Sequence, residues 1–152
     1  MIAQVADFCI PHFFVKRAIP ETLPKEMQEI VAQIKQLPKA RRVRAAYDVL
    51  TKKYKGQKFQ TYTRLWQLYE TDVATLWKQH NFIHCTAMNY LLRVLLVKSG
   101  IPDEHIELRR TLVWYLSPHQ YVRIQLTNEH VNVDVWGENN NIPYGQYATG
   151  FW

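Results

Sequence analysis

The spacing of apolar residues changes once along this chain, after Gly100, and this change constrains the fold more than any other feature. Before Gly100, apolar side chains recur every three to four residues, as they do on one face of a helix. After Gly100 they alternate with polar side chains, as they do in strands with one buried face. Helical segments that precede a run of strands predict an α+β fold with an antiparallel sheet.

Four helices are expected before the change of period. They span residues 21–37, 39–54, 61–79 and 85–99. Pro38 ends the first of them, and Gly56 stops the second. The fourth helix is apolar almost all round, which predicts that it is the central, buried helix of the domain.

Three strands are expected after the change of period, over residues 109–116, 119–126 and 130–136. The last segment is rich in Asn, Gly and Tyr and is predicted to be a loop. Residues 1–20 form an apolar arm, with a strand as one option, and residues 21–152 form a single domain. The chain is long enough, and at 47% apolar residues apolar enough, for one domain with its own core.

The net charge of +6 is unevenly distributed. Residues 1–80 carry 14 basic and 7 acidic residues, whereas residues 81–152 carry 5 and 6. The excess lies mainly within residues 35–64 and would suit an acidic partner such as nucleic acid. A solvated helical face is the favoured interpretation, because the aromatic residues there follow core-like spacing and no nucleic-acid motif is present.

Localisation is predicted to be cytoplasmic. No apolar run approaches the roughly 18 residues of a membrane span. The first residues lack a basic segment before Lys16, and Asp7 and Pro11 interrupt their apolar stretch, unlike a signal peptide. Two cysteines cannot form a disulfide scaffold in a domain of this size, so a reducing compartment is expected, with Cys9 a small buried hydrophobe.

A thiol, an imidazole and a carboxylate follow one another in the second half of the chain, as Cys85, His119 and Asp134. A cysteine nucleophile needs a base that takes its proton and a carboxylate that orients the base. Cys85 lies at an expected helix N-terminus, where the helix dipole stabilises a thiolate and free N–H groups can hold an oxyanion.

Strand parity brings the imidazole and the carboxylate together. A tight turn at residues 127–128 would place Tyr121 opposite Asp134, on the faces that do not carry the valines. His119 would then lie one diagonal step from Asp134, about 7–8 Å between Cα atoms, which allows a hydrogen bond. A slip of one residue would put Asp134 among the valines, so the register is well specified.

Each residue of this set also has a simpler interpretation on its own: a buried structural cysteine, a strand-end histidine and a solvated aspartate. His84 and His130 are competing bases, although His84 adjoins Cys85 and should point elsewhere. His80 and His84 have the i, i+4 spacing of a zinc pair, but no Glu follows the first histidine, so no metal site is predicted.

Further residues are candidates for the surroundings of the thiol. Gln79 lies six residues before Cys85 and could supply a second oxyanion donor, although a polar helix end is the simpler interpretation. Several aromatic residues could line a substrate cleft, with core packing as the alternative for each tryptophan. These residues are Trp77, Trp114, Tyr121 and Trp136.

Taken together, the chain resembles the transglutaminase-like superfamily, a branch of the papain-like thiol hydrolases, over residues 24–137. The segment 39–54 resembles the helix before the catalytic region of that family. Cys85 with Leu91-Leu92-Arg93 and Gly100-Ile101-Pro102 resembles its nucleophile helix and exit. The segments 119–124 and 131–134 resemble its histidine and aspartate strands.

The resemblance implies a central cysteine-bearing helix packed on a C-terminal antiparallel sheet, with Cys85 as nucleophile, His119 as base and Asp134 as orienting carboxylate. Tyr121 retains the aromatic residue found two places after the family's histidine. Two features depart from the family. Bulky Phe82-Ile83-His84 precedes the cysteine, and Val135-Trp136 is expected to continue the strand where the family has a turn.

The predicted function is the cleavage or transfer of a peptide or protein amide through a thioester on Cys85, as in a cysteine peptidase, an amidase or a transamidase. This chemistry requires no cofactor and no metal. The alternative is a non-catalytic transglutaminase-like module that binds a partner through its basic helices. The sequence indicates no oligomeric state and no membrane association.

Overall fold

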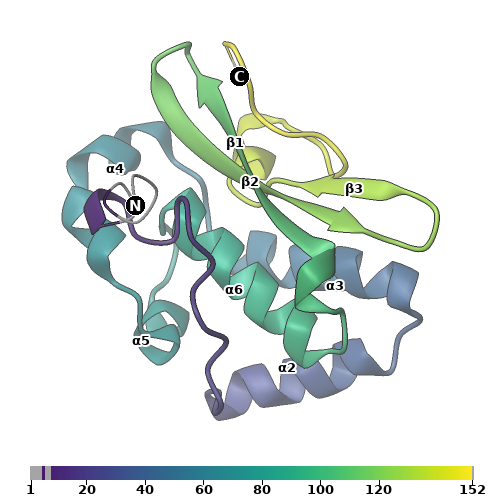
Figure 1. Cartoon of the computed structure of the whole chain (residues 1–152). Coiled ribbons are helices and arrows are strands. Elements are labelled where there is room, and N and C mark those ends of the chain that lie inside the picture. The colour runs from purple at the N-terminus through teal and green to yellow at the C-terminus, as the bar shows by residue number, and fades with distance from the viewer. Residues whose placement is uncertain (1–4, 6–7, 152) are drawn as a thin grey trace.

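The computed structural model of the chain describes Val5 and residues 8–151, and this part is an α+β fold. The helices are α2 (Lys25–Lys35), α3 (Lys39–Lys53), α4 (Lys58–Thr63), α5 (Val73–Lys78) and α6 (Cys85–Lys98). The sheet is antiparallel, in the order β1 (Ile106–Val113), β2 (Ser117–Gln125) and β3 (His130–Val133). Short 3-10 helices include η1 (Leu65–Tyr69) and η3 (Gly137–Asn140). Figure 1 shows the helices packed below the sheet.

Helix α6 is the central helix, as its sequence predicts. Every residue from Thr86 to Leu96 is buried, and α6 packs against α2, α3, α5 and β2. The helix ends where Gly100 adopts a φ of +97°, while the N–H of Ile101 donates to the carbonyl of Leu96 at 3.0 Å. Glycine tolerates this left-handed cap, so the chain leaves α6 at the predicted position.

The register of the β2–β3 hairpin agrees with the register expected from the valines. Val122 lies opposite Val133, and Ile124 lies opposite Val131. The turn at residues 127–128 is closed by a hydrogen bond from Leu126 N–H to the carbonyl of Glu129 at 2.8 Å. These pairs fix where His119 and Asp134 lie along their strands.

The segment expected as a single helix over residues 61–79 is instead divided into α4, η1 and α5, so that prediction is wrong. Arg64 leaves the helical conformation, with φ −121° and ψ 40°. Asp72 starts α5 afresh, because its carboxylate accepts hydrogen bonds from the N–H and the hydroxyl of Thr75. This side-chain N-cap stabilises a new helix start that periodicity alone does not reveal.

The ends of the strands also differ from prediction. β1 begins at Ile106, three residues earlier than expected, and β3 ends at Val133 rather than at residue 136. Beyond β3, Val135 and Trp136 form a turn that leads into η3, so the expectation that they continue the strand is wrong. The cause of this turn lies in the site described below.

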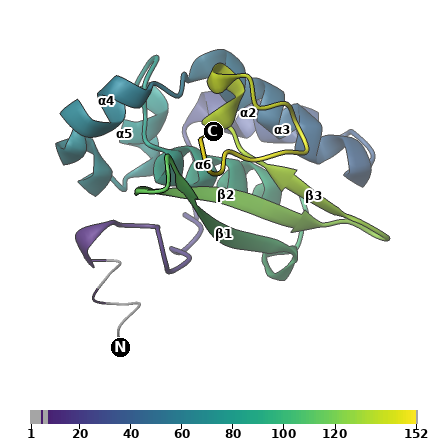
Figure 2. The same ribbon diagram turned by 90° about the horizontal axis from the view of Figure 1, so that it is seen from above.

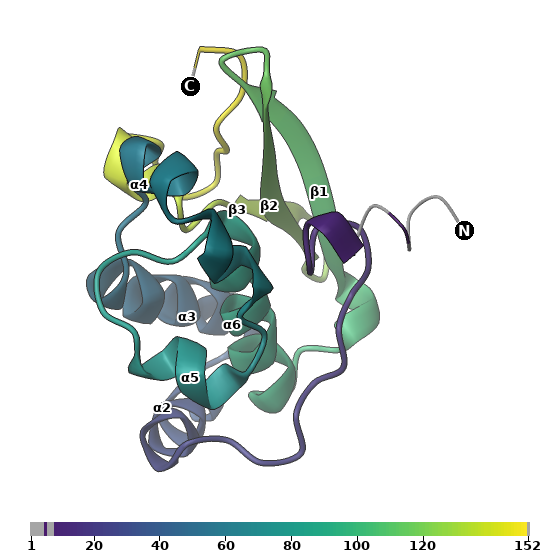
Figure 3. The ribbon, with the colours of Figure 1, turned by 90° about the vertical axis from the view of Figure 1, so that its left-hand side faces the viewer.

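Residues 8–20, the described part of the N-terminal arm, run beside β2 and α6 at the margin of the fold (Figures 2 and 3). The arm contains no strand in its described residues, and residues 1–4 and 6–7 of the expected segment lie outside the described part. Gln120 of β2 donates to the carbonyl of His12 at 2.6 Å, and Arg93 of α6 donates to the carbonyl of Arg17 at 2.6 Å. These bonds hold the arm against β2 and α6.

Both cysteines are free thiols, and Cys85 is half-buried. Cys9 is exposed on the N-terminal arm, so the expectation that it packs as a buried hydrophobe is wrong. The arm does not enter the main core at this position. Among the described residues, no helix combines the length and the apolar character that crossing a membrane requires.

Candidate active site

Cys85 is the first residue of α6, and its side chain lines a cavity. The preceding residue, His84, has extended backbone geometry, and its carbonyl accepts the N–H of Met88 at 2.9 Å. The side chain of His84 does not cap the helix. The thiol therefore lies at the positive end of the helix dipole, beside N–H groups of the first turn.

His84 points away from the thiol, as its position next to Cys85 predicts. Its Nε2 lies 2.9 Å from the carbonyl oxygen of Arg64, and the ring packs edge-on against Phe82. Burial lowers the pKa of His84, although the bond to the Arg64 carbonyl raises it. His84 therefore holds η1 against α6 rather than serving as the base.

His119 and Asp134 form a buried pair. Nε2 of His119 lies 2.8 Å from Oδ2 of Asp134, and the two residues are only 4% and 2% exposed. Cys85 lines the same cavity as His119, and its side chain is close enough to the imidazole to contribute to raising the pKa of His119. Because Nε2 is bound to Asp134, Nδ1 is the nitrogen that remains for the sulfur. The structure thus brings together the three side chains that the sequence suggests for a thiol site.

Electrostatics favour the protonated form of His119. Burial by itself would lower the pKa of His119, because it penalises the charged imidazolium. The charge of Asp134 and its hydrogen bond, followed by the interaction with Cys85, outweigh this effect and raise the pKa of His119 to about 10. At neutral pH the ring is therefore an imidazolium that can donate one N–H to Asp134 and the other to the sulfur.

Asp134 is held by the backbone as well as by His119. Its Oδ1 accepts the N–H of Gly137 at 2.9 Å, and its Oδ2 accepts the N–H of Ala148 at 2.9 Å. The bond to Gly137, three residues on, closes the turn through Val135 and Trp136 that leads into η3. A Cβ on Gly137 would lie 2.8 Å from Oδ2 of Asp134, so this close approach requires glycine.

The C-terminal segment covers the face of β2 that carries His119. The ring of Tyr147 stacks on Tyr121 with centroids 3.9 Å apart, and Ala148 is completely buried. This cover makes the site residues buried rather than solvated. The sequence gives no signal for it, because the bond from Ala148 to Asp134 uses only a backbone N–H group.

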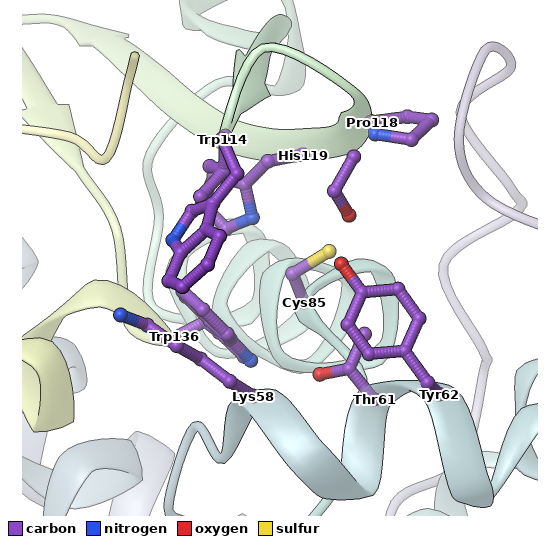
Figure 4. A pocket seen from close by; sticks show the side chains of 10 residues that line it. Lys58, Thr61, Tyr62, Cys85, Trp114, Pro118, His119 and Trp136 are labelled. Atoms are coloured by element: carbon purple, nitrogen blue, oxygen red, sulfur yellow. The ribbon is translucent and has the colours of Figure 1, made fainter. Parts of the chain in front are cut away.

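A cavity of about 130 Å³ opens over Cys85 and His119 (Figure 4). One wall comes from α4, whose residues at i, i+3 and i+4 face the thiol, and the other comes from the β1–β2 hairpin. The lining residues are Lys58, Thr61, Tyr62, Cys85, Val113, Trp114, Ser117, Pro118, His119 and Trp136. Lys58 escaped the sequence analysis because the expected helix began only at residue 61, and no sequence pattern marked Thr61 and Tyr62 as residues of a site.

The hairpin wall carries an unusual backbone conformation. Trp114 and Tyr115 both have a φ of +56°, which is strained for bulky residues. The C-terminal segment supports them, because the N–H of Trp114 donates to the carbonyl of Gly150 and Tyr115 packs edge-on against Phe151. The indole of Trp114 thereby reaches the cavity while remaining 57% exposed.

The expected cleft aromatics divide into two groups. Trp136 lines the cavity and packs 5.1 Å from His119 between ring centroids, and Trp114 lines it too. Trp77 instead belongs to the core, where its Nε1 donates to Glu26 at 2.7 Å, and Tyr121 is buried beneath Tyr147. Neither Trp77 nor Tyr121 lines the cavity, which corrects their assignment to a cleft.

Gln79 directly follows α5 and does not line the cavity. Its Oε1 is buried and makes no hydrogen bond to a described residue. The competing base His130 is exposed and pairs with Gln125 at the far end of the hairpin. His80 is exposed, and the described part of the chain contains no cluster of three His, Cys, Asp or Glu side chains suited to a metal.

Compared with known proteins, the chain matches no family model, and no curated protein or solved structure is significantly similar to it. The site must therefore be interpreted from its own geometry.

Proposed function

We propose that the chain is a thiol-dependent amide hydrolase or acyl transferase with a transglutaminase-like, papain-like active site. One observation carries this proposal: His119 is bonded to Asp134 through Nε2, and it lines the same cavity as the thiol of Cys85. A buried histidine with a purely structural role needs the carboxylate but gains nothing from facing an accessible sulfur.

The proposed reaction begins with a thiolate–imidazolium pair. The sulfur of Cys85 attacks the amide carbonyl carbon, and the carbonyl electron pair moves onto oxygen. N–H groups of the first turn of α6 stabilise this oxyanion. His119 then donates its Nδ1 proton to the amine as the C–N bond breaks, which leaves a thioester on Cys85 and a neutral imidazole.

The second half of the reaction regenerates the site. Neutral His119 accepts a proton from water, or from an amine, as that molecule attacks the thioester carbonyl. The C–S bond then breaks, the acyl group leaves as an acid or a new amide, and the imidazolium again faces the thiolate of Cys85. Asp134 stays ionised throughout and keeps Nε2 of His119 in the donor role.

A polypeptide substrate is favoured by the apolar surface beside the cavity. Two aromatic residues that line the cavity remain exposed, Tyr62 on the α4 wall and Trp114 on the hairpin wall. Exposed apolar groups clustered around a site are typical of surfaces that bind a partner chain. A bound polypeptide would contact both walls of the cavity.

The non-catalytic alternative depends on the basic helices, and two of its cations are already engaged within the fold. Arg42 donates to the backbone carbonyls of Lys35, Leu37 and Ser99. Arg44 pairs with Asp48 at 2.8 Å. These contacts favour a structural role for part of the basic segment.

Trapping of the thioester tests the proposal. We expect an activated acyl ester to add one acyl group to Cys85, detected by intact mass, and hydroxylamine to remove it. Cys85→Ala should abolish the adduct, and His119→Ala should slow its formation strongly. Acylation that survives Cys85→Ala would contradict the proposed function.

A further inference from the structure

The cavity over Cys85 presents a mainly apolar surface to a substrate. Figure 4 shows the rings of Tyr62, Trp114 and Trp136 around the thiol. Val113 and Trp136 are buried, whereas Tyr62 and Trp114 are more than half exposed to solvent. The cavity therefore has a buried apolar part and an aromatic rim. Ligand pockets commonly combine such a lining with a few polar groups that orient the ligand.

Two polar side chains of the lining are engaged within the walls. The hydroxyl of Thr61 donates to the carbonyl of Gln57 at the start of α4, at 3.0 Å. The Nζ of Lys58 lies 5.1 Å from the ring centroid of Trp114, a contact that holds an ammonium group over an indole face. A substrate group that enters the buried part therefore meets mainly apolar surface beside the reacting thiol and imidazole.

The volume of the cavity limits the size of the group that it can hold. It measures about 130 Å³. An engineered apolar cavity of about 150 Å³ in another protein takes up benzene, a molecule of six carbons. By this comparison, the cavity over Cys85 has room for an aliphatic group of about four to six carbons. The side chains of leucine, isoleucine and methionine are groups of this kind.

We propose that this cavity binds an aliphatic group of the acyl donor, so that the site selects amides whose acyl side is apolar, such as that of a leucine, isoleucine or methionine residue. This inference rests on the proposed thiol function. Cys85 retains the acyl group as a thioester, whereas the amine leaves after the first half of the reaction. A group next to the acyl carbonyl thus remains beside the sulfur, in the cavity, throughout the reaction.

A series of p-nitrophenyl esters tests the proposal, because the acyl chain varies while the leaving group stays the same. In each reaction the sulfur takes the acyl group and p-nitrophenolate leaves. The acetate, butyrate, hexanoate and octanoate esters are reacted with the unaltered chain. First-turnover acylation of Cys85 and of exposed Cys9 is measured by acid quench and peptide mass spectrometry. Division by the Cys9 rate removes the intrinsic reactivity of each ester.

We expect the ratio of the Cys85 rate to the Cys9 rate to rise about 2- to 4-fold for each added methylene up to hexanoate. The ratio should rise no further for octanoate, whose chain exceeds the cavity. A methoxyacetate ester has an oxygen in place of one methylene of the butyrate. It should give a lower ratio than butyrate, because the ether oxygen loses its hydration in an apolar cavity.

Val113 offers a variant that changes the volume of the buried part. Val113→Leu adds one methylene there and should lower the preference of Cys85 for hexanoate over acetate about 3- to 10-fold. Val131→Leu is the matched control and should leave this preference unchanged, because Val131 is half-buried on β3 and does not line the cavity. Thermal melts verify the fold of both variants, since Val113 also packs in the core.

Three results would overturn the apolar acyl pocket: a preference for hexanoate over acetate that is no greater at Cys85 than at Cys9, a ratio that rises by the same factor up to octanoate, or equal effects of the two leucine variants. The first two results come from the unaltered chain and do not depend on the variants. If Cys85 is acylated no faster than Cys9 by every ester, acetate included, the proposed thiol function itself fails.

Discussion

Replacement of Asp134 by asparagine removes one charge from a fully bonded, buried carboxylate. Oδ2 accepts hydrogen bonds from His119 and Ala148, and Oδ1 accepts one from Gly137. An asparagine has one oxygen for these three donors. Either the amide NH₂ faces Gly137 N–H, or it faces the donors of both His119 and Ala148. Each arrangement leaves at least one buried donor unpaired, which costs about 1–3 kcal/mol.

The same change removes the main cause of the high pKa of His119. Without the Asp134 charge, burial dominates and the pKa of His119 falls from about 10, so the imidazolium is lost at neutral pH. If the amide NH₂ faces Nε2, the ring must also adopt the tautomer with Nε2 unprotonated. The equivalent change in a serine protease costs about 10⁴ in turnover. A thiolate depends less on the carboxylate, so we expect the reactivity of Cys85 to fall by about 10- to 10³-fold.

The assay is the rate of iodoacetamide alkylation of Cys85 from about pH 5 to 9, with circular dichroism as the check on folding. Asn132→Ala is the control, because Asn132 lies two residues away and bonds Arg123 at 3.0 Å rather than His119. An unchanged profile in Asp134→Asn together with a shifted profile in Asn132→Ala would show that the triad is misassigned. If neither variant changes the pH profile, the catalytic role of the face of β2 that carries His119 is refuted.

Three further predictions concern the surroundings of the site. Gly137→Ala should lower both the melting temperature and the reactivity of Cys85, since the new Cβ would lie 2.8 Å from Oδ2 of Asp134; a variant with native reactivity would show that the turn adapts without cost. The folded pKa of His119 is raised to about 10, above its ordinary value of 6.5, so its stabilising contribution is complete below about pH 6.5 and is lost as pH rises through 10. Thermal melts should therefore show a loss of stability between about pH 7 and 10 that is smaller in Asp134→Asn. An equal dependence of the melting temperature on pH in both proteins would count against the His119–Asp134 pair. No oligonucleotide binding is expected at physiological salt in a fluorescence anisotropy titration, and tight binding that Lys39→Gln and Arg41→Gln abolish would favour the interaction module.

The helix of Cys85 and the hairpin of His119 and Asp134 could be predicted because local rules determine them. The all-round apolar sequence of α6 requires burial, and Gly100 ends the helix. The alternation of valines permits only one register without moving Asp134 into the apolar face. These parts of the site therefore follow from short-range patterns in the sequence.

The remaining parts of the site depend on contacts between distant segments. The N–H of Ala148 reaches Asp134 across 14 residues, and any residue other than proline could supply it. Lys58 belongs to a helix of only six residues whose position is set by its neighbours rather than by periodicity. The turn after Asp134 likewise depends on the Asp134 carboxylate, which accepts the N–H of Gly137. The sequence does not mark this turn with a Pro or an Asn after Asp134, because the next residue is Val135.

The most direct test of the account compares the two thiols of the unaltered protein at about pH 6, where an ordinary thiol, with a pKa of about 8.5, is almost wholly protonated. Cys85 and Cys9 are alkylated with iodoacetamide in the same tube, and each rate is measured by peptide mass spectrometry. The account predicts that Cys85, paired with His119, reacts at least about tenfold faster than exposed Cys9. Equal rates that rise together only above about pH 8 would contradict an activated nucleophile at Cys85.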